Sequence, residues 1–142
     1  MIDSQFSSLS APRHDETDLM KTWNSVERAI QVKTETLTTA YTRLQKQYGF
    51  QRPFLKMDTQ GYDVEIVKHA GPALTKFIGL QSEIAVKKLY ESAVGFREAI
   101  SVYESFGFEL SAFVPNNGGH FPWLVETDCI MIRGDVAARG AV

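Results

Sequence analysis

The feature that most constrains this chain is an alternation of short apolar segments with helical patterns, which begins at Phe54. Residues 54–58 and 77–84 have the length and apolar character of buried strands. After each of them, residues 64–70 and 95–106 place apolar side chains at helical spacing. Short strands that alternate with helices predict a parallel sheet covered by helices, which is an α/β architecture.

Two further strands are predicted at residues 108–114 and 125–133. The segment between them, residues 115–122, is rich in Pro, Asn and Gly, which are turn formers. Strands joined by such a turn pair antiparallel. The expected sheet is therefore mixed, with one reversed strand contributed by an antiparallel C-terminal pair.

The first third of the chain is less regular. Residues 37–48 form a helical pattern, with Thr34 or Thr36 available as its N-cap and Gly49 in the position that ends a helix. A short strand is predicted at residues 29–33, because apolar and polar side chains alternate there. Another short strand is predicted at residues 5–9, within an otherwise irregular stretch.

These patterns divide the chain into three parts. Residues 1–28 are an irregular N-terminal segment, residues 29–133 an α/β domain and residues 134–142 a C-terminal tail. The 142 residues suit one domain, since domains have roughly 100–200 residues.

Composition excludes several classes of function. The formal net charge is −2, and no run of Lys and Arg offers a surface for nucleic acid. A single cysteine excludes an internal disulfide framework and a cysteine-rich metal site, and we expect Cys129 to be a buried, inert thiol. The sequence has no apolar run long enough for a membrane span and no signal peptide, which predicts a cytoplasmic protein.

Two acidic residues fall where an α/β sheet binds ligands, at the carboxyl ends of its parallel strands. Asp58 ends the first of these strands and Glu83 lies near the end of the second. Asp58 is the candidate catalytic residue, and Glu83 is a candidate for binding a cofactor or substrate. The alternatives are that Asp58 caps the following helix and that Glu83 forms a surface ion pair.

Three more residues are candidates for binding. Gln60 and Gly61 form a turn in which the glycine can let a ligand approach the backbone, or can serve the turn alone. His120 lies in the glycine-rich loop before the last strand, where it can reach a cleft or be merely exposed. No compact spacing supports a metal site built from Asp58, Glu83 and His120.

Residues 54–71 read FLKMDTQGYDVEIVKHAG, and this block resembles the segment beginning F-L-K-[IM]-D-x-[QE]-G in the FkbM family of S-adenosylmethionine-dependent methyltransferases. Four later stretches resemble the family in the same order: LQSE at 80–83, LYE at 89–91, GF at 107–108 and TDCIMIR at 127–133. The resemblance covers most of the chain.

The resemblance implies a Rossmann-like class I methyltransferase sheet, truncated to the C-terminal half of the family domain. Its implied activity is O-methylation of a sugar or secondary-metabolite hydroxyl, with S-adenosylmethionine as cofactor and a small molecule as methyl acceptor. It carries over Asp58, Gln60 and Gly61 as the loop that lines the cleft, and Glu83 as the second acid at a strand end. The family's glycine-rich cofactor loop has no counterpart in this sequence.

A second hypothesis arises from the same truncation. A sheet that stops at residues 54–58 leaves a strand edge open, and open edges pair with other chains. The chain is then a catalytically inactive half-domain that acts as an oligomerisation or interaction module. This hypothesis predicts a homo-oligomer formed through the exposed sheet edge.

Overall fold

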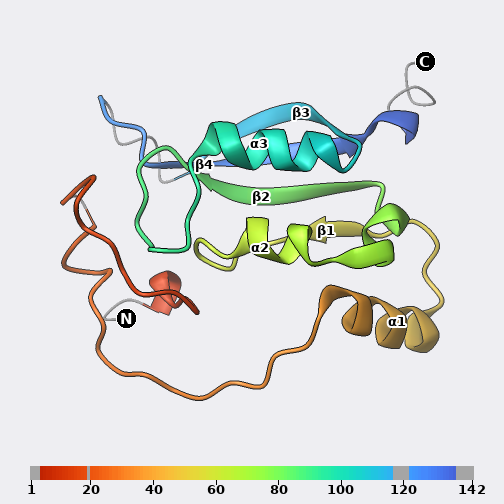
Figure 1. The fold of residues 1–142 in the computed structure, drawn as a ribbon, viewed down its shortest axis with the longest axis horizontal. Coiled ribbons are helices and arrows are strands. Elements are labelled where there is room, and N and C mark those ends of the chain that lie inside the picture. Colours follow the sequence, from red (N-terminus) through yellow and green to blue (C-terminus); the bar gives the residue numbers. More distant parts are fainter. Residues whose placement is uncertain (1–3, 19, 117–121, 137–142) are drawn as a thin grey trace.

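The structure is a computed structural model that describes residues 4–18, 20–116 and 122–136. No helix in these ranges is long and apolar enough to cross a membrane. Figure 1 shows the helices and strands along the chain. In chain order they are η1 (Ser4–Phe6), α1 (Leu37–Tyr48), β1 (Phe54–Lys56), α2 (Asp63–Lys68), η2 (Gly71–Lys76), β2 (Gly79–Ala85), α3 (Phe96–Ser105), β3 (Phe108–Pro115) and β4 (Glu126–Arg133), where η marks a 3-10 helix.

The four strands form one open sheet in the order β1-β2-β4-β3. β1 pairs parallel with β2, and β4 pairs antiparallel with both β2 and β3. Three strands therefore run in one direction and β4 runs against them. This confirms the predicted α/β class, the mixed sheet and the antiparallel pairing of the last two strands, and it is compatible with a truncated Rossmann-like fold.

The ends of α1 follow the predicted capping pattern. The Thr36 hydroxyl accepts a hydrogen bond from the Thr39 backbone N–H at 3.2 Å, which satisfies one free donor of the first turn. Gly49 adopts φ 66°, the left-handed conformation in which glycine ends helices. Local sequence therefore fixes both ends of this helix.

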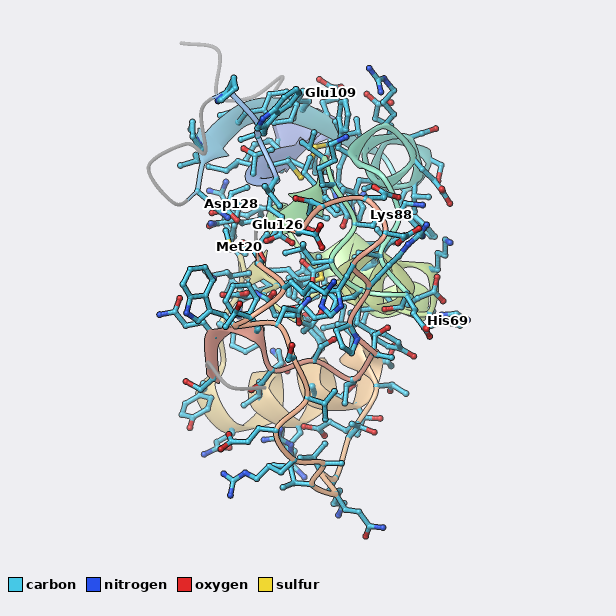
Figure 2. All side chains as sticks on the ribbon, turned by 90° about the vertical axis from the view of Figure 1, so that its left-hand side faces the viewer. Met20, His69, Lys88, Glu109, Glu126 and Asp128 are labelled. Atoms are coloured by element: carbon cyan, nitrogen blue, oxygen red, sulfur yellow. The ribbon has the colours of Figure 1, made fainter. Side chains whose placement is uncertain are left out.

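The main core lies between the sheet and one layer of helices. Leu80 and Ile84 of β2 and Met131 of β4 are buried there with Val67 of α2 and Tyr103 of α3. Figures 1 and 2 show α2 and α3 on the same side of the sheet. The expectation of a helix-covered sheet is thus met on one face only.

The other face of the sheet is partly exposed. Strand alternation turns Gln81 and Glu83 of β2 away from α2 and α3, together with Ile130 and Ile132 of β4. All four side chains are intermediate in exposure, and Phe54 of β1 is 42% exposed. This face mixes apolar and polar side chains.

A second, smaller core joins the N-terminal segment to the loop after β2. Met20 and Phe6 pack there with Leu89, Tyr90 and Val125. Backbone hydrogen bonds reinforce the contact, with Arg13 N–H donating to Leu89 O at 2.7 Å and Glu91 N–H donating to Ala11 O at 3.0 Å. The N-terminal segment therefore lies across the end of the sheet at which β1 and β2 finish (Figure 1).

Two predicted strands are wrong. Within residues 5–9 the chain forms the 3-10 helix η1 and no strand, and residues 29–33 have no regular structure. A strand needs a neighbour for its backbone groups, and residues 29–33 pair with no described strand. Ile30 is 70% exposed as a result. The 3-10 helix η2, which begins at Gly71 with Pro72 in its first turn, was not predicted.

Candidate functional site

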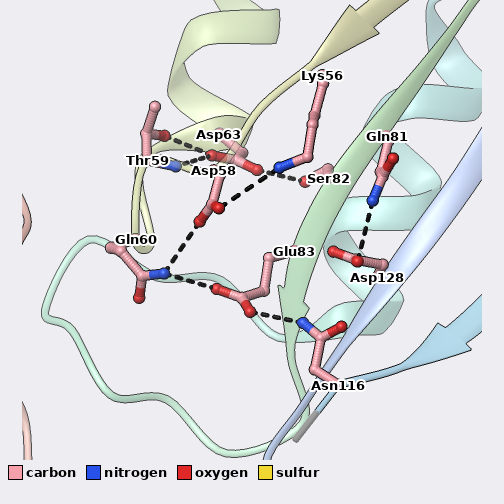
Figure 3. A network of polar contacts seen from close by, with 10 residues as sticks. All are labelled: Lys56, Asp58, Thr59, Gln60, Asp63, Gln81, Ser82, Glu83, Asn116 and Asp128. Atoms are coloured by element: carbon pink, nitrogen blue, oxygen red, sulfur yellow. Dashed lines mark hydrogen bonds and ion pairs between the residues drawn. The ribbon is translucent and has the colours of Figure 1, made fainter. Parts of the chain in front are cut away.

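Three of the five predicted site residues meet at the carboxyl ends of β1 and β2 (Figure 3). Gln60 Nε2 donates a hydrogen bond to Asp58 Oδ1 at 3.1 Å and another to Glu83 Oε2 at 2.9 Å. One amide group thus joins two acids from different strands. Gly61 comes directly after Gln60 in the same loop, whereas His120 lies outside the described residues.

Gln60 is held on every side of its amide. Its Oε1 accepts a hydrogen bond from the Tyr90 hydroxyl at 2.8 Å, and its backbone oxygen accepts one from Ser8 Oγ at 2.6 Å. Its φ of 50° is rare for a residue with a side chain. The loop is therefore fixed by contacts with the N-terminal segment and with the loop after β2.

Gly61 has a packing reason to be glycine. Its φ is 87°, and a Cβ added there would lie 2.9 Å from Tyr90 Cβ. The close approach that this glycine permits in the structure is to the Tyr90 side chain. Its role toward a ligand stays a prediction.

Asp58 is an exposed acid rather than a helix cap. Its Oδ2 lies 3.4 Å from Lys56 Nζ, and both side chains are largely in solvent. α2 begins at Asp63, and the N-cap position, Tyr62, makes no capping hydrogen bond through its side chain. The alternative that Asp58 caps this helix is wrong, and its carboxylate remains accessible to a ligand.

Glu83 is more deeply placed than a surface ion pair would be. Asn116 Nδ2 donates to its Oε1 at 2.6 Å, so that amides hold both carboxyl oxygens. Burial raises the pKa of Glu83, and the nearby negative charge of Asp58 raises it further. Glu83 therefore binds its proton more tightly than an exposed glutamate does.

A buried network that sequence reasoning missed is centred on Asp63. Its Oδ1 accepts hydrogen bonds from the backbone N–H of Thr59 at 3.0 Å and from the Thr59 hydroxyl, and its Oδ2 accepts one from Ser82 Oγ at 2.8 Å. The Tyr103 hydroxyl lies 2.7 Å from Ser82 Oγ and completes the chain of contacts. The network ties α2, β2, α3 and the loop after β1 together. Figure 3 shows its contacts among Thr59, Asp63 and Ser82.

The sequence did contain a signal for this network. Ser82 lies between Leu80 and Ile84 on the face of β2 that points into the core. A polar residue in the buried phase of a strand needs a partner, and Asp63 in the first turn of α2 is that partner.

Glu126 is a second buried acid that sequence reasoning missed. It begins β4, opposite Ala85 of β2, and is 9% exposed. Burial raises its pKa to about 8, with further contributions from the negative charges of Glu83, Asp58 and Asp63. The available signal was an acid at the start of a predicted apolar strand, between Val125 and Thr127.

Two hollows adjoin this group of acids. The smaller measures about 20 Å³, and Asp63, Glu83 and Glu126 contribute to its lining. The larger measures about 770 Å³ and separates Asp58 and Thr59 from the N-terminal segment. Its lining is rich in serine hydroxyls and also includes apolar side chains, among them Leu9, Val26, Ile30 and Val32.

The single cysteine of the chain belongs to the main core. Cys129 is fully buried, and burial raises the pKa of its thiol to about 12, in keeping with the expected inert thiol. Within the described ranges, no three His, Cys, Asp or Glu side chains are arranged to hold a metal ion.

Comparisons with models of protein families, with curated proteins and with solved structures gave no match for this chain.

Proposed function

We propose that the chain is a partial FkbM-type methyltransferase domain that O-methylates a sugar or secondary-metabolite hydroxyl. The observation that carries the proposal is the hydrogen-bonded group of Asp58, Gln60 and Glu83. Asp58 and Gln60 belong to the block that resembles the family, and the group occupies the strand ends at which α/β sheets bind ligands. The mixed open sheet is compatible with the truncated fold that the resemblance implies.

The chemistry that this proposal needs from the chain is modest. S-adenosylmethionine, when bound, supplies an electrophilic methyl group, whose transfer breaks a sulfur–carbon bond and forms an oxygen–carbon bond. Asp58 accepts the proton that the acceptor hydroxyl loses, because its carboxylate is exposed at the strand end. Gln60 holds Asp58 in place through its amide, and Glu83 fixes that amide from the opposite side.

The described residues fit one wall of a cofactor site. The larger hollow has a volume typical of small-molecule pockets, which measure about 300–1,000 Å³. Its serine hydroxyls and the carboxylate of Asp58 suit the ribose and amino-acid parts of S-adenosylmethionine, and its apolar side chains suit the adenine ring. The glycine-rich loop of the family must then come from residues outside this sequence or from a partner chain.

Calorimetric titration of the purified chain with S-adenosylmethionine tests this proposal. We expect binding at micromolar affinity, weakened about tenfold in Asp58→Asn, which removes the charge and keeps the shape. The exposed carboxylate of Glu104 gives a matched control, Glu104→Gln, with unchanged affinity. Absence of binding up to millimolar cofactor contradicts the proposal that this chain is a working enzyme.

A second candidate, the catalytically inactive half-domain, is favoured by a different observation. The face of the sheet turned away from α2 and α3 carries Phe54, Ile130 and Ile132, and β1 is an edge strand in the described sheet. Such a surface suits pairing with a second copy. Light scattering at tens of micromolar protein separates the outcomes: a dimer or larger species supports this candidate, and a uniform monomer contradicts it.

A further inference from the structure

The proposed mechanism does not use Glu126, which differs from the other acids of this group in its hydrogen bonding. Among the residues that the structure describes, none donates a hydrogen bond to its carboxyl group, although the residue is 9% exposed. Buried carboxyl groups are normally paired or hydrogen-bonded, since removal from water is costly. Among the described residues, Glu126 is therefore an acid that can take a partner from the cavity beside it.

The cavity beside Glu126 limits what that group can be. It is half open, measures about 20 Å³ and has room for one water-sized group. Its lining is divided between acids, namely Asp63, Glu83 and Glu126, and small apolar side chains that include Val94 and Ala99. A primary ammonium group fits this space, whereas a guanidinium or a quaternary ammonium is too large.

The acids around the cavity differ in how many hydrogen bonds they already accept. Asp63 already accepts three hydrogen bonds, and both carboxyl oxygens of Glu83 are held by amides. Glu126 is therefore the acceptor left for a ligand. An ammonium group brings three donors and no acceptor, which is the complement of this arrangement.

Charge favours the same ligand. Three acids, Glu83, Asp58 and Asp63, add to the rise in the pKa of Glu126 through their negative charges. Glu126 in turn contributes to the raised pKa of Tyr90. The nearest positive charge to Asp58 is Lys56, which lies in solvent and pairs with that exposed acid. A neutral hydroxyl entering the cavity brings no charge, and a ligand with a positive charge relieves the mutual repulsion of the acids.

We propose that the cavity lined by Glu126, Glu83 and Asp63 binds the primary ammonium group of a small organic amine. The role of this amine rests on the proposed function: it is then the methyl acceptor, an amino-substituted alcohol anchored by its ammonium group while its hydroxyl faces Asp58. The binding site itself is independent of the cofactor.

Titration of the chain with 2-aminoethanol and with ethylene glycol, followed by NMR of the backbone amides, tests the site. The two probes differ chiefly in the ammonium group. At about pH 8 we expect 2-aminoethanol to bind with a millimolar Kd and ethylene glycol to bind at least about tenfold more weakly. The resonances that shift should be those of Glu126, Gly61 and Val94, which line the cavity.

Three variants distinguish the contribution of the Glu126 charge to binding from an effect on the fold. Glu126→Gln keeps the shape and removes the charge, and should weaken 2-aminoethanol binding by about tenfold or more. Glu126→Asp keeps the charge and should retain measurable binding. Glu104→Gln, an exposed position on α3, should bind as the unmodified chain does.

Equal binding of the two probes, or unchanged binding in Glu126→Gln, overturns the proposal. Ammonium chloride that binds as tightly as 2-aminoethanol overturns the part that assigns an organic amine. Since no probe contains S-adenosylmethionine, loss of the proposed methyltransferase function leaves this result standing, and failure here leaves cofactor binding untouched.

Discussion

Two buried acids lie at the same end of the sheet, and their surroundings are opposites. Asp63 is 3% exposed and accepts hydrogen bonds from a backbone N–H and two hydroxyls. Glu126 is 9% exposed, lies next to the same cavity and receives no such donor from the described chain. Within the part of the chain that the structure describes, donors contact the carboxylate of Asp63, whereas none contacts that of Glu126.

The difference separates a structural acid from one that is free to act. A carboxylate supplied with donors from three parts of the fold stabilises that fold, and its oxygens are occupied. A carboxylate held without donors costs stability, and proteins keep such groups mainly at functional sites. Mutations at the two acids should therefore change stability in opposite directions.

The largest expected effect is that of Asp63→Ala. The substitution leaves the donors of Thr59 and Ser82 unsatisfied in the core, so we expect the free energy of unfolding to fall by about 4 kcal/mol. Denaturation with urea measures it. Asp58→Ala is the control, because its exposed ion pair should contribute less than about 0.5 kcal/mol. Equal losses in the two variants would remove the structural role assigned to Asp63.

The second effect has the opposite sign and depends on pH. The pKa of Glu126 is raised from 4.5 to about 8, so the folded state binds this proton more tightly than the unfolded state does. The free-energy cost of ionising Glu126 in the folded state is absent well below pH 4.5 and grows as the pH rises to about 8. Glu126→Gln removes this cost and should raise the free energy of unfolding at pH 8 by about 4 kcal/mol.

Urea denaturation of Glu126→Gln and the unmodified chain across the same pH range checks both the sign and the window. The difference between them should disappear below about pH 4, where the unmodified Glu126 is mostly protonated in both states. A variant that is less stable than the unmodified chain at pH 8 contradicts the assignment of Glu126 as an unpartnered acid.

A smaller effect is expected from the loop that positions the acids. Gly61→Ala places a Cβ against Tyr90 at a φ of 87°, which should lower the free energy of unfolding by about 2 kcal/mol. Gly95→Ala is the matched control, since nothing lies within 4 Å of its added Cβ. Its cost should be about 0.5 kcal/mol, and thermal unfolding compares the two.

The smallest effect is that of Gln60→Ala. The substitution removes the amide that joins Asp58 to Glu83 and accepts from Tyr90, at a half-buried position. The expected loss is about 1 kcal/mol, measured by urea denaturation. A loss as large as that of Asp63→Ala would show that Gln60, rather than Asp63, organises this end of the fold.

Much of the fold was accessible from the sequence, for local reasons. Short stretches of sequence predict the Thr36 cap, the end of α1 at Gly49 and the helical spacing of α1 and α3. The order of elements from Phe54 onward, including the antiparallel last pair, followed from the same patterns. Strand alternation failed at residues 29–33, because pairing depends on a neighbouring strand that local sequence does not reveal.

Site residues at strand ends could be predicted from the sequence. Site residues whose role depends on burial could not. Asp58 and Glu83 were found because parallel strands bring their carboxyl ends together. Glu126 and Asp63 were missed, because their importance comes from burial and from donors distant in sequence, such as Ser82. The contact of the N-terminal segment with Tyr90 and Gln60 likewise spans more than 50 residues and leaves no local pattern.

The most direct test of the contrast between the two acids is a carbon-detected NMR titration of the Glu126 carboxyl group, assigned by comparison with Glu126→Gln. Its half-titration should fall near pH 8, because the group is buried among other acids and no described residue donates a hydrogen bond to it. Half-titration below pH 5, close to the ordinary value for a glutamate, would contradict the account.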